Sequence, residues 1–184
     1  MITLEPFTEV DFPQLISWID NKRLLKEWSG ELFAFPLTLD SLRWYIEDTN
    51  DPKTSDVFVY KATDTHTGEM VGHISLGGIS WRNKAGRITR VLVGNTATRG
   101  RGYCQAMIKA IAAVGFEELG LHRISLGVYD FNQAAIRCYQ RAGFHREGTL
   151  RDVERYHNEY WSLVEMSMLA HEWHALKHPV KEAQ

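Results

Sequence analysis

One stretch, residues 91–107, limits the possible folds more than any other part of the sequence. It reads VLVGNTATRGRGYCQAM: an apolar strand, a polar turn, two glycines placed between arginines, and the start of a helix. Because glycine lacks a Cβ atom, the backbone N–H groups at Gly100 and Gly102 can approach a ligand closely. The first turn of the helix adds unpaired N–H groups and the positive end of the helix dipole. Arg99 and Arg101 add donors that suit phosphate. The sequence therefore predicts an anion-binding turn between a strand and a helix.

The spacing of the glycines distinguishes this turn from two other phosphate-binding turns. A P-loop ends in Gly-Lys-Ser or Gly-Lys-Thr, and neither tripeptide occurs in the chain. The dinucleotide fingerprint needs a third glycine, and Gln105 occupies that position when the count starts from Gly100. The remaining pattern resembles the acetyl-CoA pyrophosphate loop of the GNAT superfamily of N-acetyltransferases, Gln/Arg-x-x-Gly-x-Gly/Ala. Arg99 and Gly102 match it, whereas Cys104 stands where glycine or alanine is usual.

A second motif lies about 30 residues further along the chain, at residues 132–144. Two independent motifs in the order of the family make the resemblance specific, and it covers residues 2–174. The ending, at residues 146–151 and at Glu172-Trp173, is similar to the branch that contains ribosomal-protein N-terminal and spermidine acetyltransferases. The second motif follows the family pattern Asn-x-x-Ala-x-x-x-Tyr-x-x-x-Gly-Phe through Asn132, Ala135, Tyr139, Gly143 and Phe144.

The hydrophobic pattern predicts an α+β fold in one domain, residues 1–184, with a frayed tail from residue 177. The resemblance implies a central, mostly antiparallel sheet, flanked by helices, in which two neighbouring parallel strands splay apart. Residues 24–37 break helical periodicity and are predicted as an ordered loop. Gly77-Gly78 is predicted to end a strand. Strands are expected at residues 2–7, 57–62, 70–76, 86–93, 123–129 and 160–169 and from Phe144, and helices after Thr8 or Asp11, after Thr38, at residues 103–119 and 132–143, and around Glu172-Trp173.

Composition and charge argue against several classes of protein. A hydrophobic content of 44% and a charged content of 24% are ordinary for a globular domain. The formal net charge of −2 argues against a dedicated nucleic-acid binder. No apolar run approaches the ~20 residues of a membrane helix, and the first residues lack the pattern of a signal peptide. We therefore expect a cytoplasmic protein with neither nucleic acid nor membrane as a partner. Cys104 and Cys138 show neither metal-binding spacing nor a disulfide framework, so we expect them to be small apolar side chains within helices.

The resemblance implies acetyl-CoA as the cofactor and direct transfer of its acetyl group to an amine. In this family the pantetheine arm lies between the two splayed strands, which are Ile88–Val93 and Arg123–Tyr129 here. Backbone groups without sheet partners would hydrogen-bond to the arm. One N–H, at Leu92, would stabilise the oxyanion that forms on the thioester oxygen when the amine attacks. The implied cofactor contacts are Val91, Leu92, Val93, Arg99, Gly100, Arg101, Gly102, Tyr103, Cys104, Asn132, Ala135 and Tyr139.

Tyr139 is the predicted general acid. The family's tyrosine at this place faces the cofactor sulfur and protonates the leaving thiolate. A tyrosine hydroxyl suits this role because its ordinary pKa of about 10 keeps it protonated at neutral pH. The alternative is a core tyrosine packed on the sheet, which its spacing from Ile136 also permits. Asn132 can likewise cap a helix, bind the pantetheine arm, or do both.

The sequence does not identify the general base. Many relatives use a glutamate on the strand before the anion-binding turn, but residues 86–94 contain neither Glu nor Asp. His73 and Glu165 are the candidates. The ordinary pKa of histidine suits a base, although a lone histidine in a strand is more often structural. Glu165 lies in an apolar strand, where a buried carboxylate needs a partner. His157 and Glu159 lie in a predicted loop and could simply be solvated.

Aromatic side chains are predicted to shape the acceptor site. Trp28, Phe33, Trp81 and Trp161 lie in segments where this superfamily builds acceptor pockets, although the same rings could be loop packing. Protein N-termini, polyamines, aminoglycosides and small metabolite amines all remain open as acceptors, and relatives often form homodimers. Two other functions remain possible. One is a catalytically silent acyl-CoA-binding or sensory module, which the missing strand glutamate favours and the intact Tyr139 disfavours. The other is a phosphate-binding domain for nucleotides, which would take ATP or NAD in place of CoA.

Overall fold

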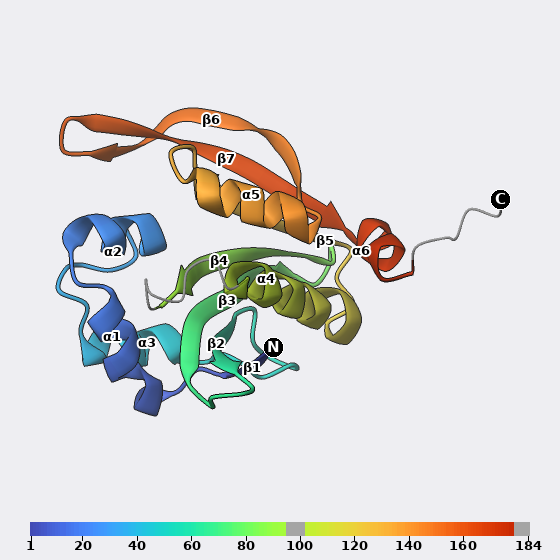
Figure 1. Cartoon of the computed structure of the whole chain (residues 1–184), viewed down its shortest axis with the longest axis horizontal. Coiled ribbons are helices and arrows are strands. Elements are labelled where there is room, and N and C mark those ends of the chain that lie inside the picture. Colours follow the sequence, from blue (N-terminus) through green and yellow to red (C-terminus); the bar gives the residue numbers. More distant parts are fainter. Residues whose placement is uncertain (95–101, 179–184) are drawn as a thin grey trace.

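The computed structural model describes residues 1–94 and 102–178 and confirms the α+β fold (Figure 1). Seven strands form one sheet in the order β1-β2-β3-β4-β5-β7-β6. Neighbouring strands are antiparallel except for β4 and β5, which are parallel. The strands are β1 (Ile2–Pro6), β2 (Phe58–Asp64), β3 (Met70–Ser80), β4 (Ala85–Val93), β5 (Arg123–Tyr129), β6 (His145–Tyr156) and β7 (Glu159–Leu169).

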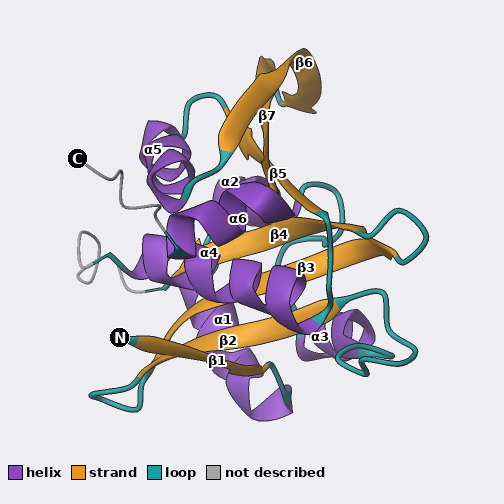
Figure 2. Ribbon diagram, turned by 90° about the vertical axis from the view of Figure 1, so that its right-hand side faces the viewer, coloured by secondary structure: helices purple, strands orange, loops and turns teal. Residues whose placement is uncertain are grey.

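Helices cover both faces of the sheet (Figure 2). One buried cluster joins the sheet to α4, α5 and α6, and a second joins the opposite face to α1, α2 and α3. None of the helices in the described part of the chain is both long and apolar enough to cross a membrane. The helices are η1 (Glu9–Asp11), α1 (Phe12–Trp18), α2 (Lys22–Ser29), α3 (Leu39–Ile46), α4 (Tyr103–Ala113), the π-helical turn η3 (Val114–Glu118), α5 (Gln133–Ala142) and α6 (Ala170–Lys177).

Helix α2 corrects the predicted loop at residues 24–37. The side chain of Asn21 caps the helix by accepting a hydrogen bond from the Leu24 N–H at 2.8 Å. Leu25 and Trp28, three residues apart, are buried on one face, which is helical spacing. The pattern is too short to predict a helix from the sequence, because Ser29-Gly30 and the following aromatic residues interrupt it after two turns.

The predicted end of β3 at Gly77-Gly78 is also wrong. The strand continues to Ser80, and its pairing with β4 becomes irregular between Gly77 and Ser80. Gly78 has a φ of +57°, a left-handed conformation that glycine adopts at little cost. The glycine pair therefore accommodates an irregularity within the strand and does not end it.

The helix after the anion-binding turn lies across β3 and β4. Met107, Ile108 and Ile111 of α4 are fully buried in the same cluster as Ile88 of β4 and Ile124 of β5. Burying each such side chain contributes roughly 1.5–3 kcal/mol. This packing fixes the start of α4 beside the carboxyl ends of the two parallel strands, where the candidate site lies.

Candidate active site

The parallel strands pair over only part of their length. Pairing runs from Ala85 opposite Arg123 to Ile88 opposite Leu126, and beyond these residues β4 and β5 diverge. A cavity of about 310 Å³ occupies the divergence, a volume in the range of small-molecule sites. Its described lining residues come mainly from α2, β4, β5 and α5, and they are Glu27, Trp28, Ser29, Gly30, Arg87, Ile88, Thr89, Arg90, Val91, Leu126, Gly127, Val128, Tyr129, Phe131, Asn132, Tyr139 and Leu163.

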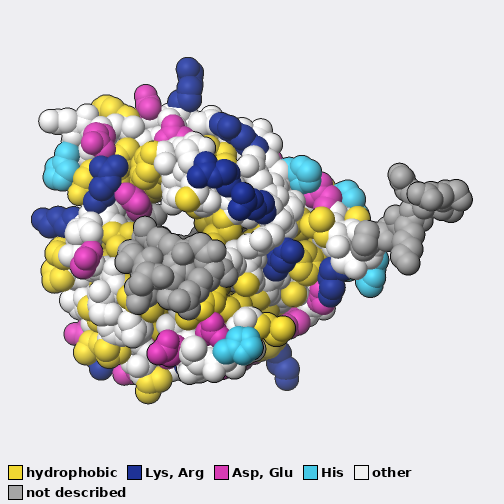
Figure 3. Space-filling model, viewed as in Figure 1, with side chains coloured by type: hydrophobic (Ala, Val, Ile, Leu, Met, Phe, Trp, Pro, Cys, Tyr) yellow, Lys and Arg dark blue, Asp and Glu magenta, His cyan; other side chains and the backbone are white. Residues whose placement is uncertain are grey.

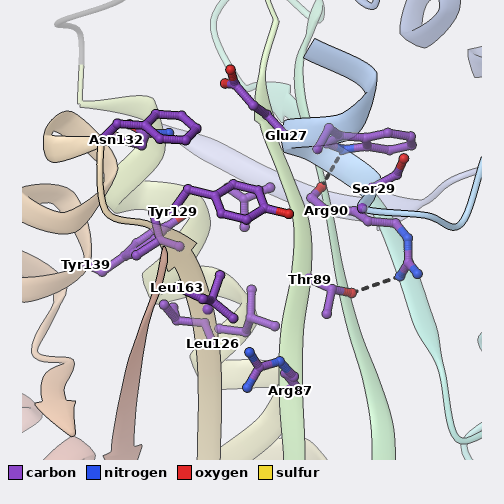
Figure 4. Close-up of a pocket in the computed structure, with 17 residues that line it drawn as sticks. Glu27, Ser29, Arg87, Thr89, Arg90, Leu126, Tyr129, Asn132, Tyr139 and Leu163 are labelled. Carbon is purple, nitrogen blue, oxygen red and sulfur yellow. Dashed lines mark hydrogen bonds between the residues drawn. The ribbon is translucent and has the colours of Figure 1, made fainter. Parts of the chain in front are cut away.

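The cavity opens on one face of the molecule. In Figure 4, Arg87 lies toward one end of the cavity and Glu27 toward the other, while Tyr129 projects from β5 across the gap toward β4. Figure 3 shows a hollow in the middle of this face, with Lys and Arg side chains gathered on the α5 side of it. Arg137 and Arg141 are exposed on α5. The predicted splay of the two strands is thus a real cleft.

An extra residue in β4 causes the divergence. His73 of β3 lies opposite Leu92, and Ser75 lies opposite Thr89, so β4 carries one residue more than β3 between these two pairs. Within this bulge Arg90 has a φ of +52°. This left-handed conformation costs a non-glycine residue roughly 1–2 kcal/mol. A β-bulge bends its strand and increases the local twist, which turns the end of β4 away from β5.

The backbone N–H groups at the end of β4 alternate between β3 and the open edge of the strand. The N–H of Gly94 donates to the Val71 carbonyl of β3 at 2.9 Å. Because successive residues of a strand direct their N–H groups to opposite edges, Val93 directs its N–H toward β5, where no strand pairs with it. Leu92, paired with His73, directs its N–H toward β3. Val93 therefore directs its N–H toward the open edge of β4 and Leu92 does not, although neither is among the described residues that line the cavity.

Tyr139 lies at the wall of the cavity that α5 forms. Its side chain is 6% exposed, and burial raises the pKa of its hydroxyl, which keeps the group protonated across the neutral range. Asn132 caps α5 by accepting the Ala135 N–H at 3.1 Å and also lines the cavity. Gly143 ends the helix with a φ of +105°. The second sequence motif thus builds one wall of the site.

The first motif is described only in part. Arg99, Gly100 and Arg101 lie outside the described residues. Gly102 precedes α4 with a φ of +80°, and the Tyr103 hydroxyl donates to the Asp64 carboxylate. That hydrogen bond is the main cause that lowers the pKa of Asp64. The start of α4 is thereby attached to the end of β2.

The two cysteines correct another expectation. Cys104 of α4 and Cys138 of α5 form a disulfide, so the prediction of separate apolar side chains is wrong. Their separation of 34 residues gave no local signal, because only the fold brings α4 and α5 together. The bond joins the helix after the anion-binding turn to the helix that carries Tyr139.

The two candidate bases occupy different surroundings. His73 is fully buried and does not line the cavity; burial lowers its pKa to about 4, so it is neutral at pH 7. Its Nδ1 lies 3.0 Å from the Arg90 carbonyl. Glu165 accepts two hydrogen bonds from Arg87, at 2.8 and 2.7 Å. Both candidate bases therefore have structural partners. The partners, Arg87 and Arg90, line the cavity, whereas His73 and Glu165 do not.

The four residues predicted to shape the acceptor site occupy different positions relative to the cavity. Trp28 lines the cavity, and Phe33 stacks on it with ring centroids 5.6 Å apart. Trp161 is buried and does not line the cavity, but its ring contacts the rings of Tyr129 and Phe131, which line the cavity. Trp81 lies 45% exposed in the turn between β3 and β4, which is not part of the cavity.

Sequence reasoning missed Glu27, Tyr129 and Phe131 as lining residues. Glu27 was missed because α2 was read as a loop. The spacing of Arg23 and Glu27, four residues apart and ion-paired at 3.1 Å, was the available signal. Tyr129 and Phe131 were recognised as the end of a strand and a helix cap, and nothing local indicated that the strand end faces a cleft.

Known proteins share this sequence and architecture. Residues 1–145 match the family model described as the acetyltransferase (GNAT) domain. The chain is 25% identical over 154 residues to the aminoglycoside N(6′)-acetyltransferase type 1 of Klebsiella pneumoniae, covering 81% of this chain and 76% of that protein. It is 27% identical over 175 residues to YdaF of Bacillus subtilis (strain 168), whose name gives it provisionally as a ribosomal N-acetyltransferase, covering 95% and 92%.

Solved structures show the same fold. The crystal structure of spermidine N-acetyltransferase from Vibrio cholerae, in complex with CoA and spermine, superimposes with a TM-score of 0.79 at 19% identity, covering 94% of this chain and 97% of that one. The match of the family model over most of the sequence agrees with the two motifs and the open edge of β4. The chain therefore belongs to the GNAT family of acetyl-CoA-dependent N-acetyltransferases.

Proposed function

We propose that this acetyltransferase transfers the acetyl group directly from acetyl-CoA to the primary amine of a small, positively charged acceptor. The observation that carries the proposal is the cavity between β4 and β5, which has Tyr139 in its wall and Glu27 at the opposite side of its lining. Direct transfer needs no nucleophilic side chain. The chain has two cysteines, and both are held in the disulfide, which leaves no free thiol to form an acyl-enzyme.

The chain's own groups fit the cofactor at three places. The open edge of β4 would hydrogen-bond the pantetheine arm, with the Val93 N–H as one donor and Asn132 facing it from α5. Val91, which lines the cavity, would pack against the arm. Arg99 to Cys104, as predicted from the sequence, would bind the diphosphate, with the φ of +80° at Gly102 allowing the chain to turn into α4. When bound, acetyl-CoA supplies the activated acetyl thioester.

Two protein groups would assist the transfer. We assign the oxyanion donor to the Val93 N–H in place of Leu92, because the Val93 N–H is directed toward the open edge of β4. Tyr139 would donate its proton to the departing sulfur. Its raised pKa favours the protonated hydroxyl that a general acid needs. His73 and Glu165 stay predictions as the base, but their contacts with Arg90 and Arg87 support structural roles for both.

The proposal for the acceptor rests on charge at the opening. Among the described residues that line the cavity, Glu27 is the one carboxylate. It belongs to one of two neighbouring ion-paired triplets on α2: Arg23 pairs with Glu27 and Glu159, and Lys26 pairs with Glu31 and Glu154, so each triplet has one excess negative charge. The pKa of Tyr129 is raised by burial and, next, by the carboxylate of Glu154, which places this charge beside the cavity.

An excess of negative charge raises the local concentration of cations and binds ammonium groups. Aminoglycosides and polyamines carry several ammonium groups, and the names of an aminoglycoside and a spermidine acetyltransferase among the similar proteins agree with this class. The aromatic ring of Tyr129 would add a cation–π contact to such an acceptor, whereas the Phe131 ring already has the Arg23 guanidinium over it, 5.4 Å from its centroid. A protein N-terminus carries one positive charge and would use less of this surface.

A panel of amines tests the proposal. Release of free CoA thiol would be followed with acetyl-CoA and, in turn, a polyamine, an aminoglycoside and a peptide with a free N-terminus. We expect turnover on at least one polycation to exceed turnover on the peptide by about tenfold or more in kcat/KM. A faster reaction with the peptide would reject the polycation class. Binding of CoA without turnover on any amine would favour the catalytically silent module.

A further inference from the structure

We propose that Trp28 and His73 are positioning residues that hold the bulge of β4 open by jointly clamping the backbone carbonyl of Arg90. This inference rests on the proposed function, since the open edge of β4 matters only if the pantetheine arm binds there. The two side chains come from α2 and β3, on the face of the sheet opposite α4. Neither would contact the reacting atoms.

The Arg90 carbonyl accepts two hydrogen bonds from side chains. The indole N–H of Trp28 donates to it at 2.9 Å, a contact drawn as a dashed line to Arg90 in Figure 4. The imidazole Nδ1 of His73 lies 3.0 Å from the same oxygen. A carbonyl can only accept, so His73 carries its proton on Nδ1. Two donors on one carbonyl fix the direction of the peptide at which β4 bends.

This carbonyl belongs to the residue of β4 that has a left-handed backbone conformation. Arg90 has a φ of +52°, and the extra residue of the bulge lies beside it. A non-glycine residue keeps such a backbone conformation only where contacts with the surrounding structure stabilise it. Without the two donors, we expect β4 to relax toward regular pairing with β5 beyond Ile88, which would narrow the cleft.

The two donors are themselves rigid. His73 is fully buried and its ring contacts those of Phe7, Trp28 and Tyr45, with centroids 4.8, 5.4 and 5.8 Å away. Trp28 is stacked on Phe33. Nε2 of His73 is buried without a hydrogen-bond partner among the described residues. A histidine placed to move protons would present this nitrogen to the site, so the geometry favours the clamp over the base.

The clamp also joins the two halves of the site. Trp28 follows Glu27, the proposed acceptor-binding carboxylate, in the same helix, and its N–H reaches the strand that would bind the cofactor. The helix that carries the proposed acceptor contact therefore also holds the bulge of β4.

Matched substitutions at residue 73 test the inference. The side-chain amide of asparagine places an N–H near the position of Nδ1, whereas glutamine places it near Nε2. We expect His73→Asn to keep CoA affinity within about twofold, and His73→Gln and Trp28→Phe each to weaken it about fivefold, the effect of one lost hydrogen bond. Calorimetry would measure binding of CoA and, in parallel, of adenosine 3′-phosphate 5′-diphosphate, which lacks the pantetheine arm.

The second ligand separates a local effect from general damage to the protein. We expect its affinity to be unchanged in all three variants, which also shows that each variant is folded. Equal CoA affinity in His73→Asn and His73→Gln, or equal weakening of both ligands, would overturn the clamp. If the unaltered protein bound CoA no more tightly than the diphosphate, the pantetheine arm would contribute nothing to binding. That result would overturn both the clamp and the proposed placement of the arm along β4. A pH profile of turnover that loses its acidic limb in both His73 variants would instead identify His73 as the base.

Discussion

A disulfide joins Cys104, in the first turn of α4, to Cys138, the residue that precedes Tyr139 in α5. The nucleotide end of the proposed cofactor site and the proposed general acid are therefore on covalently connected helices. Gln105 reinforces the connection by donating from its side chain to the Arg141 carbonyl at 2.9 Å.

Removal of the disulfide should lower stability. A cross-link between residues 34 apart restricts the unfolded chain by about 3–4 kcal/mol in the loop-entropy account. We expect Cys104→Ser/Cys138→Ser to lower the free energy of unfolding by about 2–4 kcal/mol in urea titrations. Thiol titration of the unreduced, denatured protein should find no free thiol. Two reactive thiols there would contradict the bond.

Substitution of Tyr139 by phenylalanine should affect chemistry more than binding. The change removes the hydroxyl and keeps the ring that packs in the wall of the cavity. We expect kcat to fall at least about tenfold, a size typical of lost general acid catalysis, while the Kd for CoA stays within about twofold. Steady-state kinetics and calorimetry measure the two quantities. An unchanged kcat would leave Tyr139 as a packing residue.

Neutralising Glu27 should weaken acceptor binding selectively. We expect Glu27→Gln to raise KM for a polycationic acceptor about three- to tenfold and to leave kcat nearly unchanged, because the carboxylate binds an ammonium group without joining the chemistry. Glu31→Gln is the matched control, since Glu31 belongs to the neighbouring ion-paired triplet but does not line the cavity. Equal effects of the two substitutions would show that only the summed charge matters.

The buried His73 predicts a pH dependence of stability. Its pKa is about 4 in the folded protein against an ordinary value near 6.5, so the unfolded chain takes up the proton first as the pH falls. Stability is therefore full above about pH 6.5 and decreases as the pH falls toward 4, by at most about 1.4 kcal/mol per pH unit. Urea unfolding between pH 4.5 and 8 should show a shallower dependence for His73→Asn. Identical slopes for the two proteins would contradict a neutral buried histidine.

The parts of the fold that were predicted correctly have local causes. The Asn132 cap, the positive φ at Gly143 and the apolar face of α4 depend on residues within a few positions of each other. The strands of the sheet likewise follow from apolar and β-branched runs, and two motifs in the right order identified the family.

The parts that were missed depend on contacts between distant segments. The disulfide needs α4 beside α5, and the role of His73 needs α2 beside the bulge of β4. The bulge itself depends on the pairing of β3 with β4, in which Arg90 has no distinguishing sequence signal. Glu27 was overlooked because α2 has only eight residues and a short periodic pattern.

Hydrogen exchange at single residues of β4 tests most directly whether the coenzyme completes this broken sheet. NMR would follow the amides of Val91, Leu92 and Val93 with and without CoA. We expect the Val93 amide, which is directed toward the open edge of β4, to become at least about tenfold more protected, while the Leu92 amide, already directed toward β3, changes little. An unchanged Val93 amide in the presence of saturating CoA would contradict the proposed completion of the sheet by the coenzyme.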